Sequence, residues 1–133
     1  MIAHVRTADG VAVVDLDDES LVALDPSASF DSPAEPAVEL PLVLATAAAG
    51  STLIAVVDTK PPMIVSHDAG VTWRESGRGL PAGRAVAISD ENPDVVVYAT
   101  RNRLYLSRDG GRFWRSLALE LPEIEAVALG TVP

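Results

Sequence analysis

The sequence contains no cysteine, so neither a disulfide framework nor thiol chemistry is available to it. Aromatic residues make up only 5% of the chain, although 48% of its residues are hydrophobic. Alanine and valine must therefore fill most of the core, which favours the packing of sheet on sheet over a core built around large rings. At 133 residues, the chain suits one domain with a core of modest size.

Basic residues are also scarce, with ten against 19 acidic residues and a formal net charge of −9. This balance argues against a nucleic-acid partner held through its phosphates. The imbalance lies almost entirely in residues 1–40, which carry nine acids and one arginine. We interpret this acidic stretch as a solvated surface; a docking surface and a cation site are the alternatives.

A basic region followed by an apolar run is absent near residue 1, so we expect no signal peptide and a cytoplasmic location. The uncharged stretch 40–57 reaches the lower length limit of a membrane-spanning helix. Pro41 and Gly50 make it a poor helix, however, and two strands joined by a turn describe it better. We therefore expect no membrane partner.

Two copies of one short motif occur 41 residues apart. Residues 66–73 follow the pattern Ser-x-Asp-x-Gly-x-Thr-Trp, and residues 107–114 follow Ser-x-Asp-x-Gly-x-x-Trp. A fixed period of about 40 residues indicates a repeat architecture. Around each motif lie four β-rich runs bounded by Gly, Pro, Asp or Asn, which is typical of a β-propeller blade. The predicted strands are 42–45, 53–59, 62–66 and 72–75 in the first unit, and 85–88, 94–100, 103–107 and 113–116 in the second.

A third, degraded copy of the repeat lies near residue 1 and lacks its first strand. Its predicted strands are 2–7, 11–14 and 21–24, and a lone first strand at 124–130 is left over. The predicted organisation is a single all-β propeller domain over residues 1–133, with a blade remnant 1–24, a loop 25–39, blades 40–79 and 80–120, and a closing strand.

Propellers usually have four to eight blades, and a ring of only three blades would be tight. We therefore predict a homodimer with a six-bladed ring, in which residues 124–129 of one chain complete the sheet 2–24 of the other. A nine-bladed trimer and a piece of a longer propeller are the alternatives.

The two motifs resemble the Asp box, or BNR repeat, of sialidase-like β-propellers. The resemblance implies that the boxes join the third and fourth strands of a blade, away from the ligand face. It also implies that the connections between second and third strands, and those between blades, form the ligand face.

The residue types in the motif suit a turn. Aspartate and serine oxygens accept backbone N–H groups, glycine allows a positive φ, and tryptophan buries a large ring. We predict this structural role, rather than catalysis or metal binding, for Ser66, Asp68, Gly70, Thr72, Trp73, Ser107, Asp109, Gly111 and Trp114.

Sialidases of this class use three clustered arginines, a tyrosine nucleophile with a glutamate partner, and an aspartate acid/base. They also carry an Arg-Ile-Pro signature, which is absent here. Tyr98 and Tyr105 lie inside predicted strands, so we interpret them as core or sheet-face residues. His4 and His67 show no metal-ligand spacing, and no nucleotide-binding motif occurs. We predict no catalytic residue, no metal and no cofactor.

The implied ligand face points to six loop residues as candidates. They are Asp9, Lys60, Arg78, Arg84, Arg101 and Asn102. Arginines grouped at the mouth of a channel suit a carboxylate or sulfate group. The predicted function is a non-catalytic module that binds a partner protein or a small anionic or sugar ligand. The alternatives are a glycoside hydrolase of the sialidase type, or its remnant, and an assembly or scaffold factor.

Overall fold

The computed structural model describes residues 1–30 and 42–130, and these form three four-stranded antiparallel sheets with no helix. The terminal sheet has the order β12-β1-β2-β3, the first-repeat sheet β4-β5-β6-β7 and the second-repeat sheet β8-β9-β10-β11. The strands are β1 (Ile2–Thr7), β2 (Gly10–Asp15), β3 (Ser20–Asp25), β4 (Val43–Ala49), β5 (Thr52–Val57), β6 (Met63–Ser66), β7 (Arg74–Ser76), β8 (Ala85–Ile88), β9 (Val96–Ala99), β10 (Leu104–Ser107), β11 (Arg115–Ser116) and β12 (Ile124–Leu129).

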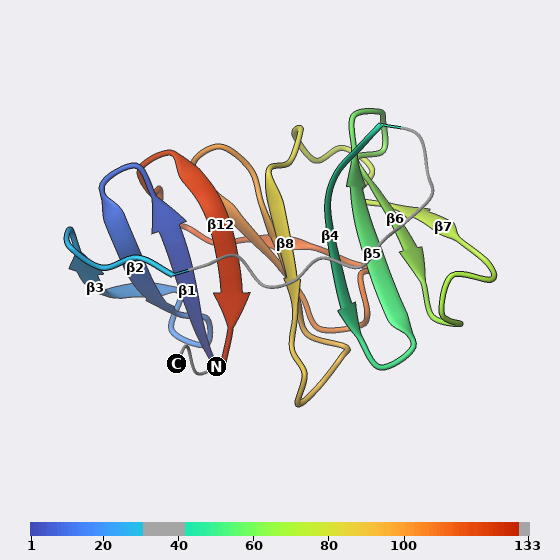
Figure 1. The fold of residues 1–133 in the computed structure, drawn as a ribbon, viewed down its shortest axis with the longest axis horizontal. Helices are drawn as coiled ribbons and strands as arrows, with labels where there is room; N and C mark the ends of the chain where they lie inside the picture. Colours follow the sequence, from blue (N-terminus) through green and yellow to red (C-terminus); the bar gives the residue numbers. More distant parts are fainter. Residues whose placement is uncertain (31–41, 131–133) are drawn as a thin grey trace.

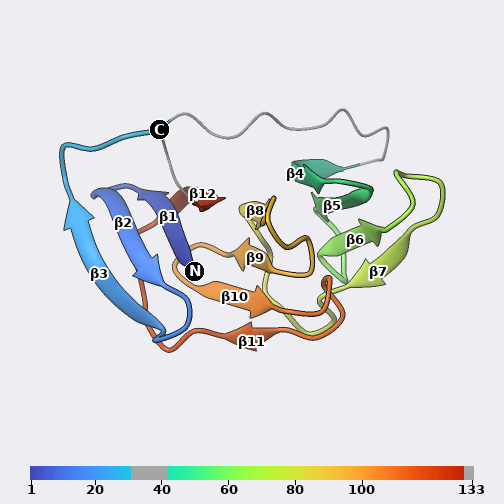
Figure 2. The same ribbon diagram turned by 90° about the horizontal axis from the view of Figure 1, so that it is seen from below.

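The second-repeat sheet lies between the other two, as Figures 1 and 2 show. Its first strand, β8, packs beside both β4 and β12, so the first strands of the three sheets run side by side. Within the described residues, no strand of the terminal sheet packs against a strand of the first-repeat sheet. The three sheets therefore form a row with two end sheets.

The terminal sheet joins the predicted degraded copy to the predicted lone strand. β12 pairs antiparallel with β1 from Ala3 opposite Leu129 to Thr7 opposite Ile124. Backbone hydrogen bonds from Ala8 to Glu123 (2.9 Å) and from Gly130 to Ile2 (3.2 Å) extend the pairing at both ends. The composition of this sheet is confirmed.

The source of the completing strand differs from the prediction, because the same chain supplies it. β12 follows the second-repeat sheet, and that sheet packs its face directly on the terminal sheet. The chain therefore reaches β1 after a short connection and needs no partner copy to finish this sheet.

The predicted strands agree with the structure to within a few residues, and the informative difference concerns the two motif tryptophans. The uncharged stretch forms β4 and β5, and the turn between them contains Gly50 at a φ of 58°. None of the described segments is a helix capable of crossing a membrane. Trp73 and Trp114 precede β7 and β11 instead of beginning them, because their indoles belong to the motif turns.

Small side chains fill both inter-sheet layers, as the composition predicts. Between the terminal and second-repeat sheets the core is made of Ala, Val, Leu and Ile only. The other layer contains the fully buried Tyr98, whose ring centroid lies 6.0 Å from those of Tyr105 and Trp114. Burial, with a smaller contribution from Tyr105, raises the pKa of Tyr98. Its hydroxyl donates to the carbonyl of Pro81 at 2.5 Å, so the largest core residue also anchors the loop before β8.

A substitution at Gly83 tests the packing of Tyr98 against the loop before β8. A Cβ at Gly83 would lie 2.2 Å from Cε1 of Tyr98. The ring is held by its hydrogen bond and by packing, so it cannot move away freely. We expect Gly83→Ala to lower the free energy of unfolding by about 1–3 kcal/mol, measured by urea denaturation. In a Tyr98→Leu background, Gly83→Ala should lower the free energy of unfolding much less. An equal cost in both backgrounds would show that the overlap with Tyr98 is not the cause.

Candidate functional site

The first of the two motifs, residues 66–73, forms a turn in which side chains satisfy backbone groups. Ser66 Oγ accepts the N–H of Gly70 (2.8 Å) and donates to Asp68 Oδ1 (2.7 Å). The carboxylate of Asp68 accepts the N–H of Thr72 (2.8 Å) and its hydroxyl (2.5 Å). These bonds, the Thr72 hydroxyl foremost, lower the pKa of Asp68 to about 2. Asp68 is therefore an ionised acceptor that belongs to the turn.

The second motif repeats this geometry with one bond exchanged, because the N–H of Arg112 takes the place of the hydroxyl of Thr72. Ser107 Oγ accepts the N–H of Gly111 (2.9 Å) and donates to Asp109 Oδ1 (2.8 Å). Asp109 accepts the backbone N–H groups of Phe113 (3.0 Å) and Arg112 (3.2 Å). Phe113 stands where the first motif has Thr72, so the hydroxyl bond is missing. The pKa of Asp109 is still lowered, chiefly by the N–H of Phe113.

The two tryptophans of the motifs serve different contacts. Trp73 Nε1 donates to the carbonyl of Gly70 in its own turn (3.1 Å). Trp114 Nε1 donates instead to Ser76 Oγ (3.0 Å), and Ser76 in turn donates to the carbonyl of Gly111. The second motif thus binds the first-repeat sheet to the second-repeat sheet. Ser76 was not among the predicted residues, because a serine at the end of a strand forms no distinctive sequence pattern.

In the degraded copy, a turn held by aspartate carboxylates takes the place of the motif. Asp15 Oδ1 accepts the N–H groups of Asp17 (2.9 Å) and Asp18 (3.2 Å). The carboxylate of Asp17 contacts the amino group of Met1 (2.7 Å) and the guanidinium of Arg108 (2.9 Å). The amino group is the largest of the causes that lower the pKa of Asp17. Arg108, within the second motif, therefore ties the terminal sheet to the second-repeat sheet.

The structure brings Arg84 and Arg101 together, but it pairs both with the same carboxylate. Glu123 Oε1 lies 2.8 Å from Arg84 Nη1 and 3.9 Å from Arg101 Nε. Nearby on β12, Glu125 pairs with Arg6 at 3.3 Å. Neither glutamate nor Arg6 was among the predicted residues. The available signal was the loop after β11, which contains Glu123 where the equivalent loop one repeat earlier contains Arg78 and Arg84.

Two further candidates, Asn102 and Asp9, make their hydrogen bonds with residues outside this ion-paired cluster. Asn102 donates its side-chain amide to the carbonyl of Leu121 (2.9 Å), and its own carbonyl accepts the N–H of Leu121 (2.8 Å). Asn102 therefore ties two loops together. The backbone N–H of Asp9 donates to Thr7 Oγ1 in a tight turn, and the residue is exposed.

Lys60 and Arg78, the remaining candidates, line one cavity of about 320 Å³ between two loops of the first-repeat sheet. Its other lining residues are Pro61, Pro62, Gly79 and Leu80. Neither cation forms an ion pair or hydrogen bond with any residue that the structure describes. Among the described residues, the lining contains no carboxylate, so none of them balances the positive charge of Lys60 and Arg78.

Gly77 explains how the two loops come so close. It has a φ of 82°, and a Cβ there would lie 2.8 Å from Met63 Cε and 3.3 Å from Pro62 Cγ. The loop of Lys60 is closed by a hydrogen bond from Val57 N to Pro62 O (2.8 Å), and the loop of Arg78 by one from Leu80 N to Gly77 O (2.9 Å). Glycine at this position lets the turn of Arg78 pack on Pro62.

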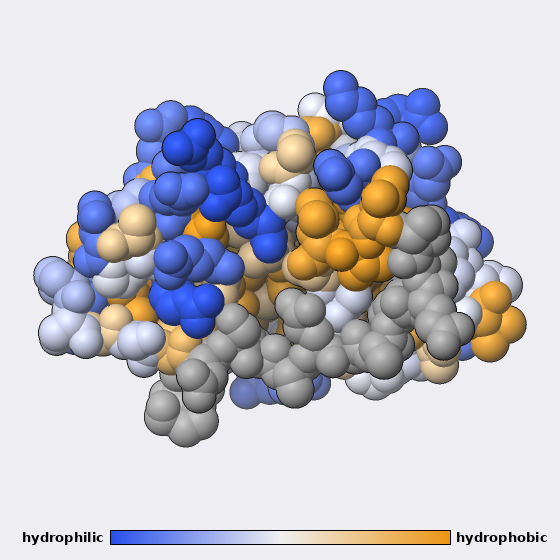
Figure 3. Space-filling model, turned by 45° about the horizontal axis from the view of Figure 1, so that its top comes forward, coloured by the Kyte–Doolittle hydropathy of each residue, from blue (hydrophilic) through white to orange (hydrophobic). Residues whose placement is uncertain are grey.

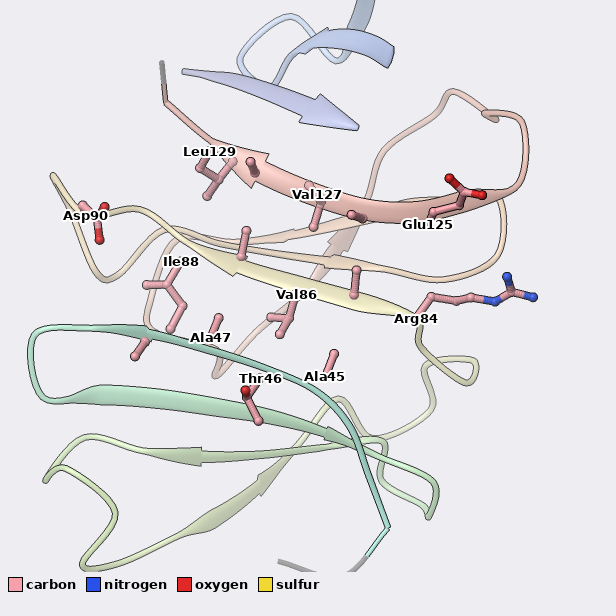
Figure 4. A pocket seen from close by; sticks show the side chains of 15 residues that line it. Ala45, Thr46, Ala47, Arg84, Val86, Ile88, Asp90, Glu125, Val127 and Leu129 are labelled. Atoms are coloured by element: carbon pink, nitrogen blue, oxygen red, sulfur yellow. The ribbon is translucent and has the colours of Figure 1, made fainter. Parts of the chain in front are cut away.

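A second cavity, also of about 320 Å³, lies along β4, β8 and β12 (Figure 4). Alanine and valine line its middle, Arg84 and Glu125 lie toward one end, and Asp90 toward the other. Arg84 and Glu125 are both ion-paired, whereas Asp90 forms no ion pair with a described residue. Within residues 1–30 and 42–130, no group of His, Asp and Glu has the arrangement of a metal site.

The hydrogen bonds of Asp68 predict a specific pH dependence of stability. A folded-state pKa of about 2, against an ordinary value of 3.8, means that the stabilising effect of Asp68 is complete above about pH 4 and is lost as the pH falls through about 2. Asp68→Asn should therefore destabilise the protein more at about pH 7 than at about pH 2, measured by urea unfolding.

Asp18→Asn is the matched control, because the carboxylate of Asp18 makes no hydrogen bond with the described residues. It should leave the pH profile unchanged. If Asp68→Asn and Asp18→Asn give the same profile, the carboxylate of Asp68 does not stabilise its turn.

No family model matches this sequence, and the search of curated proteins also finds no match. Among solved structures, a GH74 enzyme from Niastella koreensis is similar to this chain, with a TM-score of 0.48 and 24% sequence identity. The likeness covers 89% of this chain and 17% of that enzyme, so the chain spans about one sixth of the enzyme's length.

Proposed function

We propose that this chain is a non-catalytic module of the Asp-box propeller type that binds a small anionic ligand between Lys60 and Arg78. The observation that carries the proposal is the convergence of these two unpaired cations on one cavity. The paired Asp-box turns at blade spacing support the propeller assignment, and the three four-stranded sheets are then its blades.

The charge balance of the chain makes this cavity unusual. Although the net charge is −9, most arginines face a carboxylate across an ion pair. Lys60 and Arg78 are both exposed, and they repel each other across a cavity without a carboxylate. A bound anion removes that repulsion. A guanidinium offers paired N–H donors and an ammonium a compact charge, a combination that suits a carboxylate or sulfate group, including one carried by a sugar.

The same cavity favours binding over hydrolysis. Hydrolysis of a glycosidic bond ordinarily uses two carboxyl groups about 5–10 Å apart across the bond. The lining of the Lys60–Arg78 cavity has no carboxyl group, and the carboxylates of Asp68 and Asp109 are hydrogen-bonded within their own turns. A sugar held by Lys60 and Arg78 would therefore meet no acid and base pair.

The test of this site uses inorganic sulfate as the probe. Wild-type protein should bind sulfate weakly, with backbone NMR shifts centred on residues 59–62 and 77–80 and with affinity that falls as chloride is added. Lys60→Gln and Arg78→Gln should each weaken binding by about tenfold, because each removes a charge-assisted hydrogen bond.

Arg84→Gln is the matched control, since Arg84 is an exposed cation that Glu123 already balances. Sulfate affinity should be unchanged in this variant. Equal losses in all three variants would mean that sulfate responds only to net charge, and the site would be wrong.

We also propose that two copies of the chain close a six-bladed ring through the faces of their end sheets. Each end sheet packs one face on the second-repeat sheet, and its other face meets no sheet within the described residues. Leu42 and Leu44 are 58% and 51% exposed at the beginning of β4. Figure 3 shows an apolar patch in this region of the surface. Burying such a patch against a second copy is favourable.

Solution mass tests the ring. Light scattering on wild-type protein should give twice the chain mass of 13.9 kDa, because the outer faces of the end sheets of two copies pack together and bury Leu42 and Leu44. Leu44→Lys should shift the mass to that of one chain. Val71→Lys, at an 80% exposed residue of a motif turn, should leave the dimer intact. A wild-type protein that has the mass of one chain at every concentration would rule out the ring.

A further inference from the structure

The outer edge of the terminal sheet differs from the outer edges of the other two sheets. β3 is six residues long, and all six residues are exposed. The corresponding edge strands β7 and β11 have three and two residues, and they carry Arg74, Glu75 and Arg115. Short or charged edge strands discourage the addition of another strand, whereas a longer apolar edge presents unpaired N–H and C=O groups. Among the described residues, no strand covers this side of β3.

The side chains of β3 add an apolar strip to this edge. Leu21, Val22 and Leu24 are 48%, 60% and 40% exposed. In the register with β2, Leu21 lies opposite Val14, and Leu24 lies opposite Ala12.

The partners of these two leucines are core residues. Val14 and Ala12 are fully buried in the layer that faces the second-repeat sheet. Residues opposite each other on antiparallel strands share a face of the sheet, so Leu21 and Leu24 continue the core surface out to its rim.

Acidic residues flank this strip at both ends. Asp18 and Glu19 precede β3, and Asp25 is its last residue. Glu19 is paired with Arg115, whereas neither Asp18 nor Asp25 forms an ion pair with a described residue. An incoming strand therefore meets apolar surface in the middle of β3 and negative charge at each end.

A second copy of β3 is a poor occupant of this edge. Antiparallel pairing of two copies about Val22 and Ala23 would bring the acidic end of each copy, Asp18 and Glu19, close to Asp25 of the other. Like charges in such positions destabilise a pair of strands. Basic residues at the same positions would instead be attracted, so the charge pattern selects a foreign strand over a second copy.

We propose that β3 binds an extended segment of a partner protein as an added strand, which has alternating apolar residues and a basic residue at each end. Backbone hydrogen bonds along the edge supply affinity, and apolar side chains of the added strand contact Leu21 and Leu24, which share a face because the register with β2 shifts between them. The flanking charges supply the selectivity. This surface belongs to the terminal sheet, so it does not depend on the proposed anion site in the first-repeat sheet.

The test uses a fluorescein-labelled peptide, Lys-Val-Thr-Val-Thr-Val-Thr-Lys, and a second peptide with Glu in place of both Lys. Anisotropy should show that the Lys peptide binds more tightly than the Glu peptide. Hydrogen exchange should show protection of residues 20–25 when the Lys peptide is bound. Protection confined to another segment, or tighter binding of the Glu peptide, would overturn the proposal.

Variants distinguish a loss of binding at β3 from a general loss of folding. Leu24→Lys should weaken binding of the Lys peptide by at least about tenfold, since it replaces the apolar contact with a like charge. Asp18→Asn should weaken it by about two- to fivefold and leave the Glu peptide unaffected or improved. Val71→Lys adds the same charge at another exposed apolar site and should bind as the wild type does.

Thermal unfolding of each variant shows whether it is folded before binding is compared. If Leu24→Lys is folded and binds normally, the added-strand surface is wrong. Residues 20–25 of the protein alone would already be protected from exchange if β3 paired with a second copy, and Leu24→Lys would then convert a dimer to single chains. That result would overturn the proposal that β3 binds a strand of another protein.

Discussion

Backbone pairing between β12 and β1 joins segments that lie more than a hundred positions apart, and the rest of the structure depends on it. The Arg6–Glu125 contact spans 119 positions of sequence. The entropy of closing a loop grows only slowly with its length, so burial of Ala3, Val5, Ile124 and Val127 in the adjoining layer offsets the cost. Without β12, the terminal sheet would lose the strand that packs on β8, and the second-repeat sheet would lose one of its two covering layers. The pairing thereby sets the order of the sheets.

The polar contacts divide the molecule into two ends with different roles. At the end of the motif turns, Ser66, Asp68, Ser107 and Asp109 use their oxygens on backbone N–H groups, and Arg108 and Ser76 connect neighbouring sheets. At the other end, Glu123 and Glu125 balance the arginines that lie nearest to the inner strands. Among the cations that form no ion pair with the described residues, Lys60 and Arg78 lie on neighbouring loops of the first-repeat sheet and line one cavity. These two residues are the basis of the proposed anion site.

Much of the local structure could be predicted from sequence because the 41-residue period supplied an internal alignment. The run 85–88 became β8 without change, and the residues of both motifs formed the turns that their side chains suit. The order of the sheets could not be predicted in the same way, because it rests on which faces pack rather than on local pattern. The pairing of Arg84 and Arg101 with Glu123 was missed for the same reason: partners from separate repeats meet only in the folded chain.

The degraded copy shows why the motif and the four-stranded sheet must be considered separately. It lacks the serine, glycine and tryptophan of the motif, yet it forms three strands of the terminal sheet. Asp15 accepts the N–H groups of its turn, and the ion pairs of Asp17 and Glu19 take over the attachment to the second-repeat sheet that Trp114 and Ser76 provide elsewhere. The copy that has lost the motif is also the one with the longest edge strand, because β3 has six residues against three in β7 and two in β11. Loss of the motif and the apolar edge therefore occur together in the terminal sheet.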